Sequence, residues 1–470
     1  MAELCAFRAM AIEGKEVSML QRLKSFLTFW DSRYEDITKD NWSTVIYRDL
    51  SAGLVTAMTA IPMAMGFAMA SGLRPEQGLI AGSMACVVGR AFGGSKYQVY
   101  GPTAAFIPLI AMAMSKYDHG FLVLASVISG IILCALGLAG LGKIGRVVPN
   151  SIVVGFTVGI GITIAATYLY DVFGMKAGTD KNLIFKVGDI LSRLGEASPY
   201  ALALGLLVFI VTRVFQRISI YIPGLLLTVG LGTLIAATAW SGHGLENIQS
   251  KFGVIPTNFF KFTPPSLPVI TPSMLMDLSY FIIGIVFVSG VESLLCSAMA
   301  DKLAGNRKTL FDPDREFWGQ GLVQIIVPMI NGFPCTGALA RTATSIKAGA
   351  VTPLAGYFKA AAKLGMVVFM TQWLELVPLA CIGGVMLWVA SNMIKVPEIK
   401  RVLAGNRFHA FLMVYTAILV PLTDFLTGVL SALVIYMLLR RFFEAPGLAL
   451  GTTPELVVAA QPNVGEEVAA

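Results

Sequence analysis

The chain has 470 residues, of which 56% are hydrophobic and only 13% are charged. Soluble domains carry close to a quarter charged residues, so this composition excludes an ordinary soluble protein. Several windows of about twenty apolar residues carry no charge, which is the length that a helix needs to cross about 30 Å of hydrocarbon. The sequence therefore predicts a polytopic protein embedded in a lipid bilayer.

The net charge of +7 does not indicate an acidic partner. Polytopic proteins carry excess lysine and arginine in their cytoplasmic loops, and this alone raises the isoelectric point. No basic run is interleaved with aromatic residues, so no nucleic-acid partner is expected. The six cysteines lack metal-ligand spacing and the three histidines lie far apart, so the sequence predicts no metal site and no cofactor.

Residues 1–48 are mixed and charged, and they lack the apolar core and cleavage site of a signal peptide. Within this cytoplasmic N-terminal segment, MLQRLKSFLTFW at 19–30 is consistent with an amphipathic helix on the membrane surface or with a soluble lead-in. Residues 443–470 are too few for a folded domain, so we expect a short, disordered cytoplasmic tail.

The transmembrane region, 49–442, contains fourteen apolar segments, several of them short or broken by glycine and proline. They are predicted at 51–71, 77–94, 101–115, 120–141, 150–169, 198–215, 222–240, 279–299, 318–332, 336–348, 352–371, 376–394, 408–421 and 423–440. With a cytoplasmic N-terminus, the inner connections carry most of the loop cations. The positive-inside rule then predicts a multi-pass protein of the inner (plasma) membrane with both termini in the cytoplasm.

The third and tenth segments resemble each other. One begins VYGPTAAFIPLI at 99–110, and the other lies in GFPCTGALARTATSIKAGAVTP at 332–353. Each has an extended stretch followed by a proline, a threonine and small residues, at equivalent places in two halves of seven segments. Such matched, Gly/Pro-interrupted segments are the best sequence indication of a transporter binding site, although one alone would be read as an ordinary proline kink.

These two helix starts predict an anion site. A helix that begins inside the membrane presents unpaired N–H groups and the positive end of its dipole. Proline suits the first turn because it has no N–H to lose, and Thr103 and Thr336 are expected to cap the helices or to donate to the anion. Small neighbouring residues let a ligand approach the backbone; with Pro102 they are Gly101, Ala104, Ala105, Gly337 and Ala338.

Two charged residues fall inside apolar segments. Arg341 follows Thr336 by five residues, and a charge at this depth costs about 2.5–3.5 kcal/mol, so it is expected to face a cavity and support anion binding unless the segment is offset to the interface. Glu292 could pair with Arg341, bind Na⁺ with Ser289 and Ser293, or take up a proton during transport. Each serine taken alone is more often bonded to the carbonyl four residues earlier.

Three further residues have simpler interpretations. Lys359 and Lys363 lie one turn apart near the start of the eleventh segment, where their side chains are expected to extend to the membrane interface. Phe67 in the first segment is either a packing residue or part of the wall of the site.

Four strings together resemble the sulfate permease (SulP) family of anion transporters over residues 45 to 440. They are GPTAA, NSIVVGFTVGIGI, GVESLLCSAMADK and GFPCTGALARTATSIKAGAVTPLAG. The resemblance implies an all-α fold of fourteen transmembrane segments in two inverted repeats of seven. It also implies a core domain (about 49–141 and 279–372), a gate domain (about 149–240 and 376–442), elevator-like alternating access and an association into homodimers that is seen in many members.

By position, the resemblance also implies the residues that line the substrate site between the third and tenth helices. They are Phe67, Thr103, Ala104 and Ala105 on one side and Thr336, Gly337, Ala338, Leu339, Ala340 and Arg341 on the other. Glu292 matches the acidic position linked to cation coupling. Many members have a serine in place of Ala340, a glutamine in place of Met63 and a STAS domain after the last helix, which this sequence is expected to lack.

These features predict a secondary active transporter, not an enzyme, that moves a small inorganic or carboxylate anion by symport with H⁺ or Na⁺. Sulfate is the expected substrate, and a Na⁺-dependent bicarbonate transporter is the nearest alternative, followed by an anion exchanger, a dicarboxylate transporter or a channel-like pathway. A permease for uncharged solutes would not need Arg341. An enzyme would need a catalytic cluster and a primary pump a P-loop, and the sequence has neither.

Overall fold

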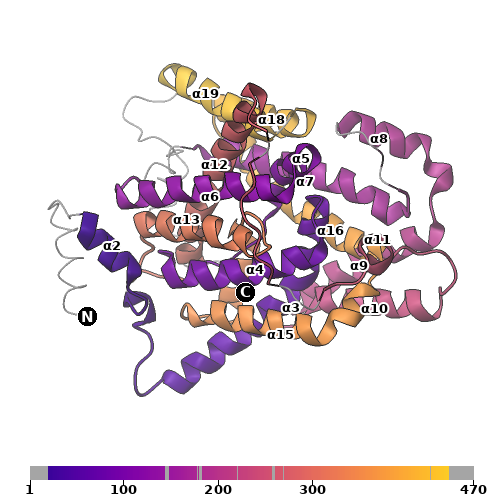
Figure 1. The fold of residues 1–470 in the computed structure, drawn as a ribbon, viewed down its shortest axis with the longest axis horizontal. Helices are drawn as coiled ribbons and strands as arrows, with labels where there is room; N and C mark the ends of the chain where they lie inside the picture. The colour runs from indigo at the N-terminus through magenta and orange to yellow at the C-terminus, as the bar shows by residue number, and fades with distance from the viewer. Residues whose placement is uncertain are drawn as a thin grey trace.

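The computed structural model describes residues 19–142, 148–176, 178, 183–219, 221–256, 260–267, 269–423 and 425–443. Helices make up nearly all of the regular structure in these ranges (Figure 1). Seven of the described helices are long and apolar enough to cross a membrane. The expected all-α polytopic architecture is therefore confirmed.

The long candidate spans alternate along the chain with shorter helices. The candidate spans are α3 (Trp42–Ala70), α6 (His119–Leu138), α7 (Asn150–Phe173), α9 (Pro199–Ile218), α12 (Pro272–Leu303), α15 (Leu354–Glu375) and the consecutive pair α16 (Leu379–Met393) and α17 (Val396–Ala404). The other helices are α2 (Met19–Leu27), α4 (Pro75–Phe92), α5 (Ile107–Lys116), α8 (Leu183–Ser192), α10 (Gly224–Thr238), α11 (Ile248–Phe252), α13 (Pro313–Met329), α14 (Leu339–Lys347), α18 (Arg407–Leu422) and α19 (Phe425–Phe443), with short 3₁₀ turns η1 (Ser32–Tyr34), η2 (Ala104–Phe106) and η4 (Leu194–Glu196). Each of the fourteen predicted segments overlaps a helix, but the number of membrane crossings stays a prediction.

Proline, glycine and capping side chains set many of the helix ends. Helices α4, α9, α12, α13 and α17 carry proline in their first turn, where the missing N–H would have had no partner. The Asp312 carboxylate caps α13 by accepting from the N–H groups of Asp314 and Arg315. Helix α7 ends at Gly174, whose φ of 67° is left-handed. The local sequence therefore specifies where these helices begin and end.

Two groups of helices pack mainly among themselves. In the first group, α13 lies against α6 and α4, α15 lies against α3 and α4, and α12 lies along α6. In the second, α7 packs against α16 and α18, and α9 packs against α16 and α10. Helix α3 also contacts α16 and α10 and so connects the groups. We call the first set the core group and the second the gate group, after the predicted domains. The division of the chain into two domains and their relative movement stay predictions.

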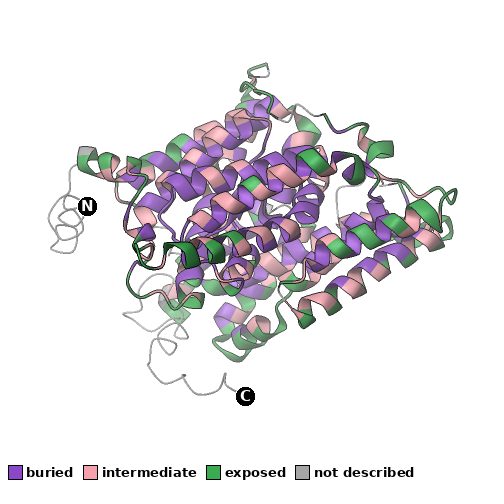
Figure 2. Cartoon of the chain, turned by 90° about the horizontal axis from the view of Figure 1, so that it is seen from below, coloured by how far each residue is buried: buried purple, intermediate pink, exposed green. Residues whose placement is uncertain are grey.

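Large apolar side chains lie on the outer faces of several helices. Buried residues fill the interior of the helical body, and exposed residues follow its outer faces and loops (Figure 2). Phe369 and Trp373 on α15 are 86% and 66% exposed, and Leu234 on α10 and Met437 on α19 are also exposed. Such a surface would be unfavourable in water and is favourable against lipid tails.

The first helix of the described chain packs against the membrane region. Helix α2 covers most of the predicted amphipathic stretch, and Phe26 on it is buried, with its ring centroid 6.1 Å from that of Trp318 on α13. Helix α2 is therefore held against α13 on one side. Neither a soluble lead-in nor a helix that lies only on lipid would need this contact. The predictions for residues 1–18 and for 444–470 lie outside the described residues.

A buried ion pair anchors the segment that follows α2. The Arg33 guanidinium donates to the carbonyl oxygens of Arg90 (3.0 Å), Ala91 (3.1 Å) and Gly93 (2.5 Å), and it pairs with Asp31 at 2.9 Å. Burial alone would raise the pKa of the Asp31 carboxyl, but the charge and hydrogen bond of Arg33, together with Arg315, lower it below its ordinary value. The N-terminal segment is thus fixed to the loop that leads into the candidate site.

Candidate functional site

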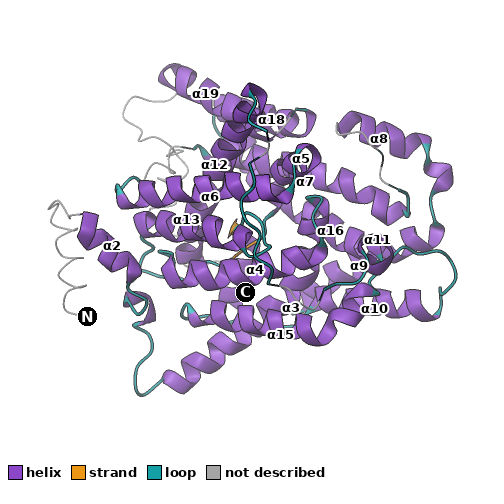
Figure 3. Ribbon diagram, viewed as in Figure 1, coloured by secondary structure: helices purple, strands orange, loops and turns teal. Residues whose placement is uncertain are grey.

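Two short extended stretches pair with each other at the centre of the first helix group. β1 (Tyr100–Gly101) runs antiparallel to β2 (Thr336–Gly337), with Tyr100 opposite Gly337 and Gly101 opposite Thr336 (Figure 3). The Ala338 N–H donates to the Val99 carbonyl at 3.0 Å and extends the pairing. Because backbone is non-helical here, its polar groups need partners, and each stretch supplies them to the other.

Each strand leads into a short helix, as the matched motifs predict. Strand β1 continues through η2 into α5, and strand β2 continues into α14. The structure therefore brings Gly101, Pro102 and Thr103 together with Thr336 and Gly337, although more than two hundred residues separate them in the sequence. The small residues predicted to line the site belong to the same region; they are Ala104 and Ala105 in η2 and Ala338, Leu339 and Ala340 at the start of α14.

The two threonines do not cap these helices, so the predicted capping role is wrong. The Thr103 side chain makes no cap hydrogen bond and donates instead to Oε2 of Glu292 at 3.1 Å. Thr336 lies in β2, before the N-cap residue Ala338, and its hydroxyl donates to the Ser289 carbonyl at 3.4 Å. Both hydroxyls are used to connect the helix starts to α12.

Arg341 is the charged residue at the centre of this arrangement. It is 3% exposed, and its Nη2 donates to the Pro102 carbonyl oxygen. Its Nε and Nη1 atoms are buried and have no hydrogen-bond partner among the described residues. A Cβ at Gly101, whose φ is 152°, would lie 2.9 Å from Nη1, so glycine is needed for the guanidinium to lie against this turn. A buried guanidinium with free donors is suited to binding an anion.

Glu292 and its neighbouring serines have separate partners. No ion pair joins Glu292 to Arg341 within the part of the chain that is described, so that predicted option is not realised. Ser293 donates to Glu316 and accepts from Gln98, and Ser289 accepts from Gln324 at 2.6 Å. The interpretation that Ser293 donates to the backbone carbonyl four residues earlier is therefore wrong. Their part in binding a coupling ion stays a prediction.

Phe67 lies on α3, in the largest buried apolar cluster. Ala104 and Ala105 belong to the same cluster, and Phe67 is almost fully buried in it. The nearby Gly66 carbonyl accepts a hydrogen bond from the hydroxyl of Tyr168 on α7, across the two helix groups. Phe67 is therefore a buried packing residue of α3, and whether it touches substrate stays a prediction.

A buried polar network behind β1 was not predicted from the sequence. The Glu316 carboxylate accepts from the N–H groups of Gly94 (2.9 Å) and Ser95 (3.2 Å), from Gln98 (2.7 Å) and from the Tyr100 hydroxyl (2.8 Å). This network fixes the chain that runs into β1.

Helix α13 supplies a matching support for β2. Its Gln320 and Gln324 amides donate to the Cys335 carbonyl at 2.5 and 2.7 Å. Glu316, Gln320 and Gln324 are spaced four residues apart, so they share one face of α13, and from Phe317 onward the two glutamines are the only polar side chains of this helix. This spacing is the sequence signal that would have revealed the network.

The prediction that Lys359 and Lys363 extend to the membrane interface is wrong. They are 1% and 0% exposed, on the face of α15 that packs against α3 and α4. Lys359 Nζ donates to the Tyr100 carbonyl at 3.1 Å, and Lys363 Nζ donates to the Gly78 carbonyl at 3.4 Å. Hydropathy along one helix could not reveal that this face points inward to β1 rather than outward to lipid.

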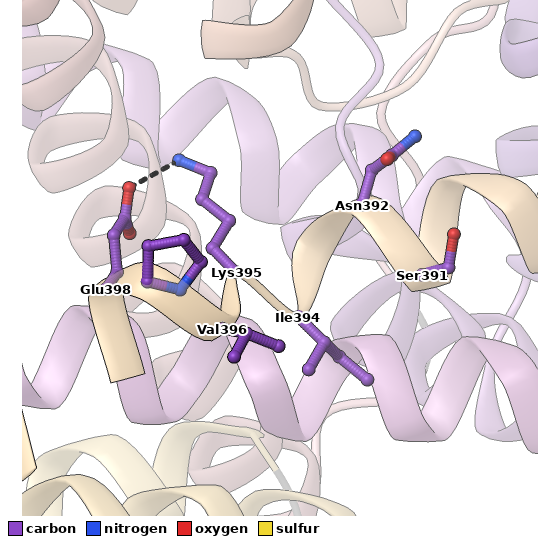
Figure 4. Close-up of a pocket in the computed structure, with 7 residues that line it drawn as sticks. Ser391, Asn392, Ile394, Lys395, Val396 and Glu398 are labelled. Atoms are coloured by element: carbon purple, nitrogen blue, oxygen red, sulfur yellow. Dashed lines mark hydrogen bonds and ion pairs between the residues drawn. The ribbon is translucent and has the colours of Figure 1, made fainter. Parts of the chain in front are cut away.

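A shallow pocket lies elsewhere, where α16 turns into α17. Ser391, Asn392, Lys395 and Glu398 contribute its polar groups, and Lys395 pairs with Glu398 at 2.9 Å (Figure 4). Both charged side chains are partly exposed. None of the predicted site residues lines this pocket, so it carries no part of the site described here.

Comparison with known proteins identifies the family of this chain. The model of the sulfate permease family matches residues 46–416, which include both strands, Glu292 and Arg341. The chain belongs to the sulfate permease family. It is a multi-pass membrane transporter and not an enzyme, and the relatives below are transporters of anions.

Two relatives illustrate the family. YvdB of Bacillus subtilis (strain 168), which carries a provisional name as a sulfate transporter, is 32% identical over 401 residues, covering 85% of this chain and 74% of that protein. The bicarbonate transporter BicA of Picosynechococcus sp. is 26% identical over 393 residues, covering 81% of this chain and 68% of that protein.

Solved structures share the fold. The transmembrane domain of a cyanobacterial BicA aligns with a TM-score of 0.68 and 23% identity, covering 82% of this chain and 97% of that chain. SLC26A9 aligns with a TM-score of 0.75 and 19% identity, covering 87% and 67%.

Proposed function

We propose that this anion transporter of the sulfate permease family carries sulfate by symport with H⁺ or Na⁺. The observation that supports this most strongly is Arg341, which is buried between two helix starts and has two nitrogen atoms without a partner among the residues that the structure describes. An anion between α5 and α14 would meet these donors, the backbone N–H groups of both helix starts and the positive ends of their dipoles. The provisional name of YvdB supports sulfate as the substrate.

The predicted site residues have distinct roles in this proposal. The small residues from Gly101 to Ala105 and from Gly337 to Ala340 let the anion approach the backbone. Arg341 offsets its charge, and Glu292, joined to Thr103, exchanges the coupling cation. The H⁺ or Na⁺ is expected to bind near Glu292, because it is the carboxylate bonded to the start of η2.

Transport is proposed to follow an elevator-like movement of the core group against the gate group. The candidate site lies on the core group, because β1, β2, α12 and α13 are joined by buried hydrogen bonds. Such a connected body can move as a unit and carry the anion with it. We further propose a location in the inner (plasma) membrane, cytoplasmic termini and a homodimer, each as expected from the sequence.

A Na⁺-dependent bicarbonate transporter is the second candidate. The 26% identity to BicA supports it, as does Ala340, which offers no hydroxyl at a position where many family members have serine. Such a site would hold the same half-helices and Arg341. Exchange or dicarboxylate transport by the same site is the remaining alternative.

Uptake into proteoliposomes tests the proposal. Labelled sulfate and labelled bicarbonate are supplied with an imposed pH gradient, a Na⁺ gradient or neither. Accumulation of sulfate that requires one of the gradients is the expected result. Bicarbonate uptake that requires Na⁺ would replace sulfate with the second candidate, and the absence of any gradient dependence would contradict symport.

A further inference from the structure

Two buried lysines lie behind the helix starts, and the function proposed above gives them no role. Lys359 and Lys363 each donate one hydrogen bond to a backbone carbonyl, that of Tyr100 and that of Gly78 respectively. Within the described ranges, neither ammonium group lies at ion-pair distance from a carboxylate. A buried lysine without a carboxylate partner tends to lose its proton unless an anion offsets its charge, so an anion bound nearby would favour the charged ammonium form.

Two glycines make room for Lys363 and Arg341 beside the candidate site. A Cβ at Gly82 on α4 would lie 2.3 Å from Lys363 Nζ and 3.2 Å from Pro102 Cδ. A Cβ at Gly101 would lie 2.9 Å from Arg341 Nη1 and 3.3 Å from Gly82 Cα. The Lys363 ammonium and the Arg341 guanidinium therefore both lie close to the contact between α4 and the Gly101–Pro102 turn.

The charges around the helix starts are mostly positive. Arg341, Lys359 and Lys363 lie on α14 and α15, whereas Glu292 is the carboxylate that is hydrogen-bonded to a helix start, through Thr103. Arg90 and Glu316 are also buried, and their formal charges sum to zero. An anion bound in front of Arg341 would therefore experience a surplus of positive charge at short range.

We propose that Lys359 and Lys363 are specificity-determining residues that, with Arg341, make the site prefer a divalent anion to a monovalent one. This inference rests on the proposed anion transport and deepens it by assigning the charge of the substrate. The lysines act through their electric field, because their ammonium groups donate to backbone carbonyls rather than pointing at the helix starts. Arg341 supplies the direct hydrogen bonds.

Coulomb's law gives this proposal a quantitative signature. The interaction energy is proportional to the product of the two charges, so removal of one lysine charge weakens a dianion twice as much as a monoanion of the same shape. The loss in the logarithm of the affinity is therefore twice as large for the dianion as for the monoanion. The fold-change in affinity for the dianion is the square of the fold-change for the monoanion. A lysine with a merely structural role would change both affinities by the same factor.

Sulfate and perchlorate make a matched pair of probes, because both are tetrahedral and they carry two charges and one. Labelled sulfate uptake into proteoliposomes, and its inhibition by perchlorate, are measured for wild type, Lys359→Met and Lys363→Met. Each variant is expected to lower the apparent affinity for sulfate about tenfold and that for perchlorate only about threefold. Lys400→Met, which changes an exposed lysine on α17, is expected to alter neither affinity.

Equal losses for the two anions would overturn the inference, and so would a larger loss of affinity for perchlorate than for sulfate. Wild-type protein that takes up bicarbonate but no sulfate would overturn it too, whereas wild-type protein that takes up no anion would contradict the proposed function itself. If both methionine variants fail to fold, as judged by gel filtration, Gly82→Ala replaces them. The added Cβ displaces the Lys363 ammonium while every charge is retained. The ratio of the affinity for sulfate to that for perchlorate should then fall about threefold. An unchanged ratio would overturn the inference.

Discussion

Arg341 donates from Nη2 to the carbonyl oxygen of Pro102 and so connects two segments that are 239 residues apart in the chain. Pro102 precedes η2 and α5, and Arg341 lies in the first turn of α14. The bond uses one of the guanidinium nitrogen atoms, and Nε and Nη1 stay unpaired within the described structure. The same residue therefore holds the two helix starts together and offers donors to a ligand between them.

Replacement of Glu292 by glutamine is expected to separate accumulation from exchange. Glutamine resembles only the neutral form of the carboxyl, so it cannot bind and release a coupling cation, while it keeps an oxygen for the Thr103 hydroxyl. Gradient-driven sulfate accumulation should fall to background, and exchange of internal for external sulfate should persist. Both are measured in proteoliposomes, with Glu398→Gln on the exposed side of α17 as the control. Full accumulation by Glu292→Gln would remove the coupling role.

Replacement of Glu316 by glutamine is expected to destabilise the core group. The carboxylate accepts hydrogen bonds from Gly94, Ser95, Gln98 and Tyr100, and an amide NH₂ would face several of these donors. The buried mismatch costs about 3 kcal/mol, which for a chain of this length corresponds to a midpoint for thermal unfolding in detergent that is lower by about 3 °C. A midpoint equal to that of wild type would mean that the network does not support β1.

The buried Asp31–Arg33 pair is expected to make the stability of the N-terminal contact depend on pH. The pKa of Asp31 is lowered in the folded protein, so its contribution is fully present above the unfolded value of about 3.9 and is lost as the pH falls through the lower folded value. Asp31→Asn should destabilise the protein by about 3 kcal/mol near neutral pH. This difference between wild type and variant should shrink below about pH 4.

Thermal unfolding of wild type and Asp31→Asn from pH 7 to pH 3 measures that difference. Asp36→Asn, which removes a partly exposed partner of Lys96, serves as the matched control and is expected to have a smaller effect. A difference between wild type and Asp31→Asn that is constant over the whole range would mean that the Asp31 charge does not stabilise the segment.

The matched motifs predicted the two half-helices because their information is local. Short segments that begin with proline, threonine and small residues specify half-helices by themselves, and Arg341 lies within one of them. The structure adds the antiparallel pairing of Tyr100 with Gly337, which no local pattern specifies. It also shows that Thr103 and Thr336 bond to α12 instead of capping, because α12 passes beside both helix starts.

Other residues were missed or misjudged because their environment depends on neighbouring helices. Glu316 resembles a charge at a helix end, yet it is buried because the loop before β1 folds over α13. Lys359 and Lys363 look like interfacial lysines until α3 and α4 cover that face of α15. The sequence therefore predicted which segments form helices and which of them break, while tertiary packing determined which charges are buried.

Sulfate binding to purified protein, with and without Arg341, tests the central claim most directly. Arg341→Ala removes two buried donors and a charge, and the loss of charge-assisted hydrogen bonds should weaken binding measured by calorimetry about 10- to 100-fold. Arg407→Ala, at an exposed arginine that begins α18, should bind sulfate as wild type does. Unchanged affinity in a folded Arg341→Ala protein would show that the anion does not bind between α5 and α14, and would contradict the account.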